Sequence, residues 1–411
     1  MNRLERHIYN KIRFHPKIKK IITCLYHRLF SIVPIKKIQT DYNVMVREGY
    51  FFGFHDKCPW SPDNKYLLAH KYKTDLKMPR EEDIVEIGYF DGQDQTDFKS
   101  IAITHTWNWQ MGSMLQWVSN TNNIIYNDYN GKNHIAKMVD INGNILREYS
   151  KPIAAVSVNG EYALSHSFVR LRNAASAYGY ANSDHESMFN NIPQKDGIYL
   201  LNLKNGKSRL LFSINDIANY DTDNYPKNSY HYFTHCLFSP SGKRFAFYHR
   251  WVEENNQTWT RLLTCNLDGS AIFSFDFSGV VTHLAWQDDK HLLAYGYKKG
   301  VGDQYYLLED GTNNFSIIGK DIFTSDGHPQ FAPNQEDFVT DTYPDRLRRQ
   351  YLIRYNVNSK KQDNLAIIKS PFPFTGDVRC DLHPRWDRTG KSIAFDSSHT
   401  GKRALCTIRL D

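Results

Sequence analysis

The chain has 411 residues, of which 41% are hydrophobic and 14% aromatic, so it can bury one large core or two modest ones. Its formal charge of +7 is uneven, because residues 1–38 hold ten Lys and Arg side chains against one Glu, which leaves −2 for the remainder. A nearly neutral body excludes the broad basic surface typical of nucleic-acid binding. The six cysteines are scattered without close pairs and we identify no export signal, so we expect reduced cysteines in a cytoplasmic protein.

The first element expected in chain order is an amphipathic basic helix over residues 17–33. Apolar side chains recur there every three or four residues, and Pro16 and Pro34 flank the segment. Arg28 interrupts the apolar run, so the segment is too polar to span a membrane. Two interpretations stay open for this arm, residues 1–41: peripheral attachment to the anionic surface of an inner membrane, or packing of the helix on the main domain.

One phrase recurs after residue 42, in which an aromatic residue or Val is followed by a polar turn and a strand. Its copies begin at residues 60, 117, 156, 238, 286, 331 and 386. Repeats of about 40–50 residues with four strands each are typical of β-propeller blades. We therefore predict an all-β fold, a seven-bladed β-propeller over residues 42–411, with the N-terminal helix outside it. The last repeat has only three strands, and the segment near residue 45 is expected to supply the fourth and close the ring.

Four successive repeats begin their first strand with a histidine, and a cysteine stands near the last of them. The residues are His235, His283, His328, His383 and Cys380. Equivalent positions of different blades converge at the central channel of a propeller, so these side chains are expected to meet. Neutral imidazole and thiolate are ligands that zinc prefers. The alternative is that each histidine bonds a neighbouring backbone carbonyl at the start of its strand.

The wording of several segments resembles bacterial seven-bladed propellers related to oligogalacturonate lyases and ulvan lyases, over about residues 42–411. The segments are WNWQMGSMLQW, YALSHSFVRLRN, TDTYPDRLRRQ and FTGDVRCDLHPRW. The resemblance implies a polysaccharide lyase that cleaves uronic-acid glycans by β-elimination. It also implies a metal held by histidine and cysteine ligands from consecutive late blades. These ligand types favour zinc, and a closed set of four favours a structural role. Those ligands map onto His283, His328, Cys380 and His383.

Elimination from a uronate needs a base and a cation that stabilises the charge developing on the carboxylate. Arginine matches a carboxylate with two parallel hydrogen bonds, which favours Arg170 and Arg172. The candidate catalytic residues are Arg170, His105, His166, His235 and Tyr248. The candidate substrate-binding residues are Arg172, Trp107, Trp109, Gln110 and Arg346. For each of them the alternative is an ordinary structural or surface side chain.

Three functional interpretations remain from the sequence. The first is a lyase-like enzyme that acts on an acidic, uronate-containing polysaccharide. The second is a non-catalytic glycan-binding or scaffolding protein of capsule or other cell-surface polysaccharide biosynthesis, and the third is a transferase of such a pathway. The second and third gain weight because Trp109 and Gln110 stand where ulvan lyases carry a histidine. No phosphate-binding loop, dinucleotide fingerprint or nucleophile elbow occurs in the sequence.

Overall fold

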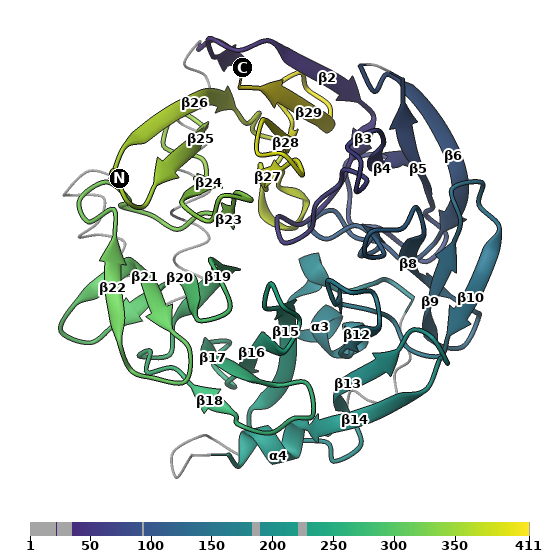
Figure 1. The fold of residues 1–411 in the computed structure, drawn as a ribbon, viewed down its shortest axis with the longest axis vertical. Helices are drawn as coiled ribbons and strands as arrows, with labels where there is room; N and C mark the ends of the chain where they lie inside the picture. Colours follow the sequence, from purple (N-terminus) through teal and green to yellow (C-terminus); the bar gives the residue numbers. More distant parts are fainter. Residues whose placement is uncertain (1–21, 23–34, 93, 183–189, 221–227, 411) are drawn as a thin grey trace.

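The structure, a computed structural model, describes residues 22, 35–92, 94–182, 190–220 and 228–410. Its strands form seven antiparallel sheets arranged in a ring (Figure 1). The prediction of a seven-bladed propeller is confirmed. The helix predicted over residues 17–33 lies, apart from Ile22, outside the described residues. Among the described residues, no helix has the length and apolar character needed to cross a membrane.

The first three blades each contain four strands. Blade 1 contains β3 (Tyr50–Phe51), β4 (Leu67–Tyr72), β5 (Val85–Asp91) and β6 (Asp97–Thr104). Blade 2 contains β7 (Gln116–Trp117), β8 (Ile124–Tyr129), β9 (His134–Val139) and β10 (Ile145–Tyr149). Blade 3 contains β11 (Ala155–Val156), β12 (Tyr162–Ser165), β13 (Gly197–Asn202) and β14 (Ser208–Ser213).

The remaining blades follow the same order. Blade 4 contains β15 (Tyr230–Phe238), β16 (Arg244–Val252), β17 (Thr258–Asn266) and β18 (Phe273–Ser274). Blade 5 contains β19 (Val281–Trp286), β20 (His291–Lys298), β21 (Gly302–Glu309) and β22 (Phe315–Ile318). Blade 6 contains β23 (Gln330–Phe331), β24 (Asp337–Asp341), β25 (Arg349–Asn356) and β26 (Gln362–Lys369). Blade 7 contains β27 (Arg385–Trp386), β28 (Ser392–Ser397) and β29 (Ala404–Arg409).

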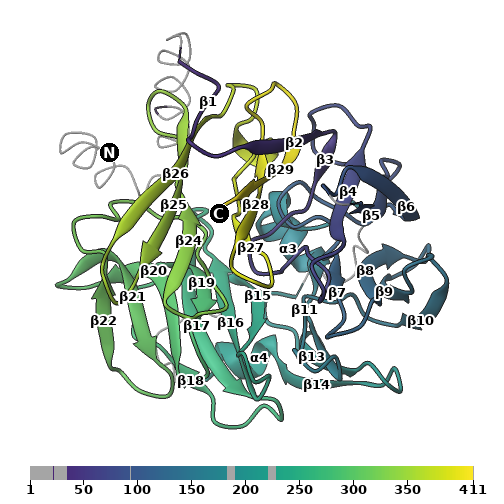
Figure 2. The same cartoon turned by 45° about the horizontal axis from the view of Figure 1, so that its top comes forward.

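The two ends of the propeller chain close the ring. β2 (Val44–Glu48) pairs with β29 as the fourth strand of blade 7, which confirms the expectation for the segment near residue 45 (Figure 2). β1 (Ile38–Gln39) pairs with β26 as a fifth strand of blade 6. Residues 38–39, which the sequence analysis placed in the arm, are therefore part of the propeller sheet.

The repeated phrase folds into the same hairpin in several blades. In blade 1, the backbone N–H of Ser61 donates to the carbonyl of Tyr66 over 2.9 Å, and the Ser61 hydroxyl accepts from the Tyr66 N–H. In five of the seven repeats the fourth residue after the repeat start has a positive φ, which suits Gly and Asn. The residues are Asn64, Gly160, Gly242, Gln335 and Gly390.

The aromatic residue that starts the phrase joins neighbouring blades. The indole N–H of Trp117 donates to the carbonyl of Pro59 in the preceding blade, at 2.8 Å. Trp286 reaches Leu237 and Trp386 reaches Gln330 in the same way, each at 3.2 Å. The phrase thus specifies both the hairpin and the contact between blades, because one side chain buries apolar surface and satisfies a carbonyl at once.

A segment of blade 1, residues 52–57, runs into the central channel. The carboxylate of Asp396 in β28 accepts from the backbone N–H groups of Phe52 and Gly53, each at 3.0 Å. Gly53 has a φ of 122°, and a side chain there would lie 2.8 Å from the backbone of Met111. Only glycine permits this close approach. Further along, the ring of His55 contacts the carbonyl of Pro329 in blade 6 through Nδ1, at 2.8 Å.

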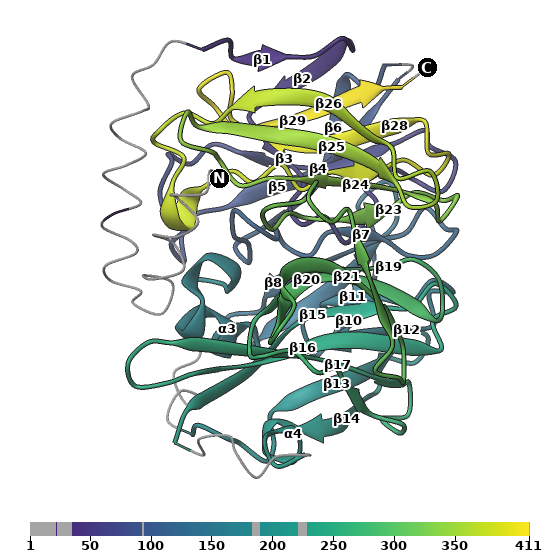
Figure 3. The same ribbon diagram turned by 90° about the vertical axis from the view of Figure 1, so that its left-hand side faces the viewer.

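The long interval between the third and fourth repeats holds helical turns. α3 (Phe168–Ala174) and η1 (Ser176–Tyr178) lie between β12 and β13, and α4 (Ile214–Ala218) follows β14. η3 (Gly376–Val378) precedes blade 7. In the side view, α3 lies at one end of the strands, beside the sheets (Figure 3). The hydroxyl of Ser176 donates to the Asp377 carboxylate over 2.7 Å, so the turns η1 and η3 meet.

Candidate functional site

The four strand-start histidines lie together in the channel. The ring centroid of His328 is 4.1 Å from that of His283 and 4.3 Å from that of His383, and His235 lies 6.4 Å from His283. The ring of Phe54 packs against all four, at 4.8 to 6.2 Å. Three of the histidines have φ values of 32° to 55°. Such strained backbone turns their side chains out of the regular strand pattern.

Each ring is fixed through its Nδ1 atom, and three of the four have a buried Nε2 without a partner among the described residues. The Nδ1 partners of His235, His283, His328 and His383 are Thr234 Oγ1, Asp326 Oδ1, Asp341 Oδ1 and the Gly53 carbonyl, at 2.7 to 3.0 Å. Within the described residues, the Nε2 atoms of His55, His235, His328 and His383 are buried without a hydrogen-bond partner. An anchored Nδ1 with a free Nε2 is the arrangement of metal-ligating histidines.

A possible divalent-metal site follows from these free atoms. The ligand atoms of His328, Asp381 and His383 lie within 4.8 Å of one another, and all three residues are buried. One oxygen of Asp381 accepts from Arg379 Nε at 2.7 Å, while Oδ1 is buried without a partner in the described chain. Imidazole and carboxylate together suit several divalent transition metals. Three protein ligands also leave positions for water or substrate, as catalytic sites do.

The expected set of four ligands differs from this group in two members. Asp381 belongs to this group, whereas its neighbour Cys380 does not. Burial raises the pKa of Cys380 to about 12, so its thiol stays protonated at neutral pH. His283 packs on His328 but falls outside the group of atoms within 4.8 Å. The group thus contains two of the four expected ligands, His328 and His383, with Asp381 in addition; a zinc site that also uses His283 and Cys380 stays a prediction.

The electrostatics favour a cation at this group. Burial lowers the pKa of His383 well below its ordinary value, so the imidazole is neutral at pH 7. Burial acts in the same direction on His328, but the Asp341 carboxylate outweighs it and raises the pKa of His328. Asp341 also accepts from the backbone N–H groups of Leu382 and His383, at 3.0 and 3.1 Å. Asp341 therefore fixes both His328 in blade 6 and the segment that carries His383 in blade 7.

A second group of polar side chains lies beside His235. The ring of Tyr248 is 5.4 Å from His235, and the guanidinium of Arg250 lies 5.2 Å from the Tyr248 ring. In the described part of the chain, Tyr248 OH, Arg250 Nε and both ring nitrogens of His166 are buried without a partner. Burial lowers the pKa of His166 to about 4 and raises that of Tyr248, so both are neutral at pH 7. These atoms are therefore available to a polar ligand or to water.

Lys57 belongs to this second group and was missed from the sequence. Its Nζ lies 2.7 Å from Asp56 Oδ2, and both side chains are only 8% exposed. Burial and, after it, the charge of Lys57 lower the pKa of His166, and Lys57 also acts on His235. Lys57 stands three residues before Trp60, as His235 stands three before Phe238. Extending that register to blade 1 would have found it.

Arg170 was expected to grip a carboxylate, and the structure gives it other partners. The side chain is fully buried. Its guanidinium donates to the carbonyls of Asn190, Asn191 and His231 at 2.7 to 3.0 Å. Arg170 therefore clamps α3 onto blade 4, and Arg250 takes its place beside the histidines. Arg172 is half-buried and donates to the Ser176 carbonyl at 3.0 Å.

The other predicted residues do not join the ring. Trp107 and Trp109 are buried, and their indole N–H groups donate to the carbonyls of Asp83 and Lys77 at 2.9 and 2.7 Å. Gln110 is also buried and donates to the Arg379 carbonyl. These three side chains hold loops together and offer no open surface to a sugar. The remaining two, His105 and Arg346, are exposed.

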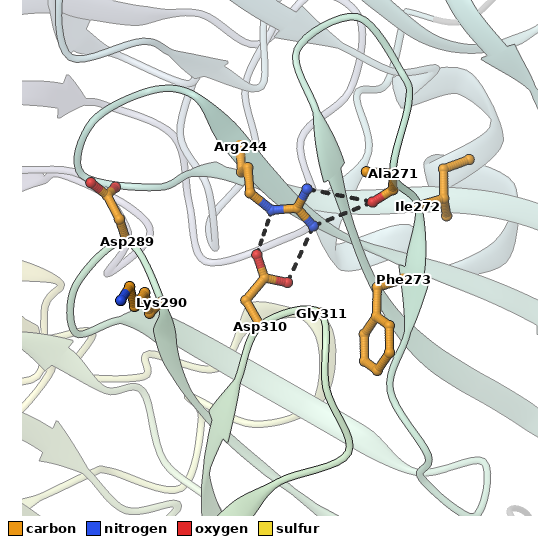
Figure 4. Close-up of a pocket in the computed structure, with 8 residues that line it drawn as sticks. All are labelled: Arg244, Ala271, Ile272, Phe273, Asp289, Lys290, Asp310 and Gly311. Carbon is orange, nitrogen blue, oxygen red and sulfur yellow. Dashed lines mark hydrogen bonds and ion pairs between the residues drawn. The ribbon is translucent and has the colours of Figure 1, made fainter.

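A separate cleft of about 480 Å³ lies between blades 4 and 5. Its lining comes from hairpin turns of the two blades, where Arg244 and Asp310 form two hydrogen bonds of 2.5 and 3.3 Å (Figure 4). The guanidinium is thus already neutralised by its own chain. None of the histidines of the channel lines this cleft, so it is distinct from the candidate site.

The fold and the channel together define a closed seven-bladed propeller with a histidine-lined centre. Two solved oligogalacturonate lyases share this fold. One, in complex with manganese, is 15% identical with a TM-score of 0.63, and the alignment covers 92% of this chain and 95% of that one. The other, from Vibrio parahaemolyticus, is 12% identical with a TM-score of 0.62, over 92% and 99% of the two chains. No protein-family model and no curated protein matches the chain. The expected resemblance to oligogalacturonate lyases is confirmed for the fold.

Proposed function

We propose that this propeller binds a divalent cation in its channel and cleaves an acidic, uronate-containing oligosaccharide by β-elimination. The observation that carries the proposal is the group of His328, Asp381 and His383, whose ligand atoms lie within 4.8 Å of one another and which has buried atoms without a partner among the described residues. The manganese in one oligogalacturonate lyase of the same fold supports the choice of ligand. Zinc, the metal expected from the sequence, stays a prediction to be tested beside manganese.

His235 is the proposed base and Tyr248 the proposed acid. Burial keeps the pKa of His235 well below its ordinary value, so its imidazole is neutral at pH 7. Its Nε2 has no hydrogen-bond partner among the described residues and is therefore the nitrogen available to accept a proton. The base removes the proton α to the carboxylate, the electron pair forms a carbon–carbon double bond, and the β carbon–oxygen bond breaks. The leaving oxygen takes a proton from the Tyr248 hydroxyl, which is buried without a partner.

The carboxylate of the sugar needs positive charge while this proton leaves. Lys57 and Arg250 are the proposed cations, since the charges of both act on His235. A divalent cation held by His328, Asp381 and His383 would supply further charge for an anionic sugar and help to orient it.

The test incubates the purified full chain with oligogalacturonate and other acidic oligosaccharides, with chelator or with added Mn²⁺ or Zn²⁺. We expect ultraviolet absorbance from an unsaturated uronate, and its loss with chelator. His235→Asn should lower the rate by about 100-fold or more. Tyr199→Phe is the control, because that hydroxyl bonds the Lys195 carbonyl on an exposed part of blade 3. No absorbance with any sugar would contradict the proposed activity.

Non-catalytic glycan binding is the second candidate. It is favoured by one observation, namely that turn η1 covers the histidines, with the Tyr178 ring 6.0 Å from that of His235. Calorimetry with the same sugars separates the two candidates, because a binding protein would release heat without producing the absorbance. A transferase role and a place in capsule biosynthesis remain proposals of lower support, as does attachment to a membrane through residues 17–33.

A further inference from the structure

The segment between β12 and β13 lies over the histidine ring. Within it, residues 167–182, here called the insertion, include α3 and η1. The carbonyl of Tyr178 accepts from Asn108 Nδ2 at 2.9 Å, which ties the insertion to the loop that leads into blade 2. Phe168 and Tyr180 pack in the same apolar cluster as Phe54, at the centre of the channel. The insertion is therefore a built cover of the site.

Two side-chain contacts join the insertion to the segment before blade 7. The hydroxyl of Ser176 donates to Asp377 Oδ2 at 2.7 Å, and Arg379 Nη2 donates to the hydroxyl of Tyr178 at 2.6 Å. Each pair is separated by 201 residues in sequence. These contacts are made only when the insertion docks across the channel, because their partners come from blade 3 and blade 7.

Arg379, which contacts the insertion, also contacts the candidate cation site. Its Nε donates to Asp381 Oδ2 at 2.7 Å, which leaves Oδ1 of that carboxylate free. The guanidinium lies 5.7 Å from the ring of Tyr178 and 6.0 Å from that of Tyr343. The Tyr343 ring in turn lies 5.6 Å from His328. Arg379 is thus held between the insertion and two of the three candidate ligands.

We propose that Tyr178 and Arg379 are positioning residues that couple docking of the insertion to cation binding at Asp381. The inference rests on the cation site of the proposed function but does not depend on the sugar or the reaction. A docked insertion fixes Arg379, and Arg379 fixes the Asp381 carboxylate with one oxygen toward His328 and His383.

The coupling has a physical cause in the hydrogen bonds of one guanidinium. Without the Tyr178 hydroxyl, an N–H of Arg379 loses its acceptor. The Arg379 side chain then becomes more mobile, and so does the Asp381 carboxylate that it holds. Ligands that are anchored by a second partner bind metal more tightly than free ones. Linkage makes the effect reciprocal, so a bound cation stabilises the docked insertion by the same factor.

The first measurement is the affinity for Mn²⁺, read from the electron paramagnetic resonance of the free ion. Arg379→Met should weaken binding by about 10- to 100-fold, the range for partners of metal ligands, and Tyr178→Phe by about 3- to 10-fold. Ser176→Ala should also weaken binding, although Ser176 touches neither Arg379 nor a ligand. Tyr199→Phe, the matched hydroxyl deletion on the same blade, should bind as the natural chain does.

The second measurement is hydrogen exchange of backbone amides in residues 168–178. Added Mn²⁺ should slow their exchange in the natural chain and have a smaller effect in Tyr178→Phe, which removes one oxygen and is expected to fold. Equal affinities together with equal exchange would overturn the coupling. A natural chain that binds no Mn²⁺ would overturn the cation site and the coupling with it. Intact coupling in a chain without elimination activity would support this inference and contradict only the proposed reaction.

Discussion

Replacing Asp396 by Asn tests how the first and last blades are joined. Asp396 is fully buried, and its carboxylate accepts from Phe52 N, Gly53 N and Arg385 Nη2, each at 3.0 Å. An Asn side chain of the same shape has one acceptor oxygen and an amide group that donates. Whichever way this amide is turned, its NH₂ faces at least one of the three donors.

The loss of stability follows from these contacts. A buried backbone N–H without an acceptor costs about 1–3 kcal/mol. Arg385 is fully buried as well, and removing the charge of its partner brings the expected loss to about 3–5 kcal/mol. Adding Arg385→Met should recover part of the loss, because the unpaired charge is removed while the backbone donors of Phe52 and Gly53 remain unsatisfied.

Urea unfolding followed by tryptophan fluorescence measures this loss, since the chain has eight Trp residues. Asp97→Asn is the control, because Asp97 is exposed on the outer strand of blade 1 and its change should stay within about 0.5 kcal/mol. A loss below about 1 kcal/mol for Asp396→Asn would refute the reasoning, and so would an Arg385→Met addition that makes the protein less stable still.

Three further predictions concern other parts of the chain. Lys57→Met should raise KM for oligogalacturonate by about tenfold or more, with a smaller effect on a methyl-esterified substrate; equal changes would contradict a carboxylate contact. Burial lowers the pKa of His70 to about 3, so below pH 6.5 the unfolded chain takes up a proton that the folded one does not. Stability should fall by about 1.4 kcal/mol per pH unit from this group, and urea unfolding of His70→Gln should show a shallower decline. The full chain should float with anionic vesicles more than a chain that begins at Ile35; equal flotation would mean that residues 17–33 do not bind lipid.

The architecture could be predicted because each blade repeats the same local chemistry. A positive-φ position such as Gly242 and an aromatic residue such as Trp386 recur in most of the hairpins, so the pattern is visible in the sequence. The place of His235 and His328 in the channel follows from the same register. Lys57 obeys that register too, but a lysine does not stand out in a search for metal ligands.

The roles of individual side chains were harder to predict, because burial depends on distant segments. Arg170 looks like a surface arginine in its own sequence, yet its partner His231 stands 61 residues away. Trp107 and Trp109 are likewise covered by loops that the local pattern does not place. Asp381 was accessible from the sequence, since it alternates with His383 in an extended stretch, but the preference for a thiolate ligand drew attention to Cys380 instead.

The seven equivalent positions of the channel divide it into two sides. In blades 4 to 7 the position three residues before the repeated aromatic residue is His, whereas blades 1 to 3 have Lys57, Met114 and Ile153. Met114 belongs to the same apolar cluster as Phe54 and as Phe168 of the insertion. On the other side, the Nε2 atoms of His235, His328 and His383 have no hydrogen-bond partner among the described residues. The ring of His383 is hydrogen-bonded through Nδ1 to the carbonyl of Gly53, which lies 330 residues earlier in the chain. Because this contact joins the two ends of the propeller, the candidate site is complete only when the ring is closed.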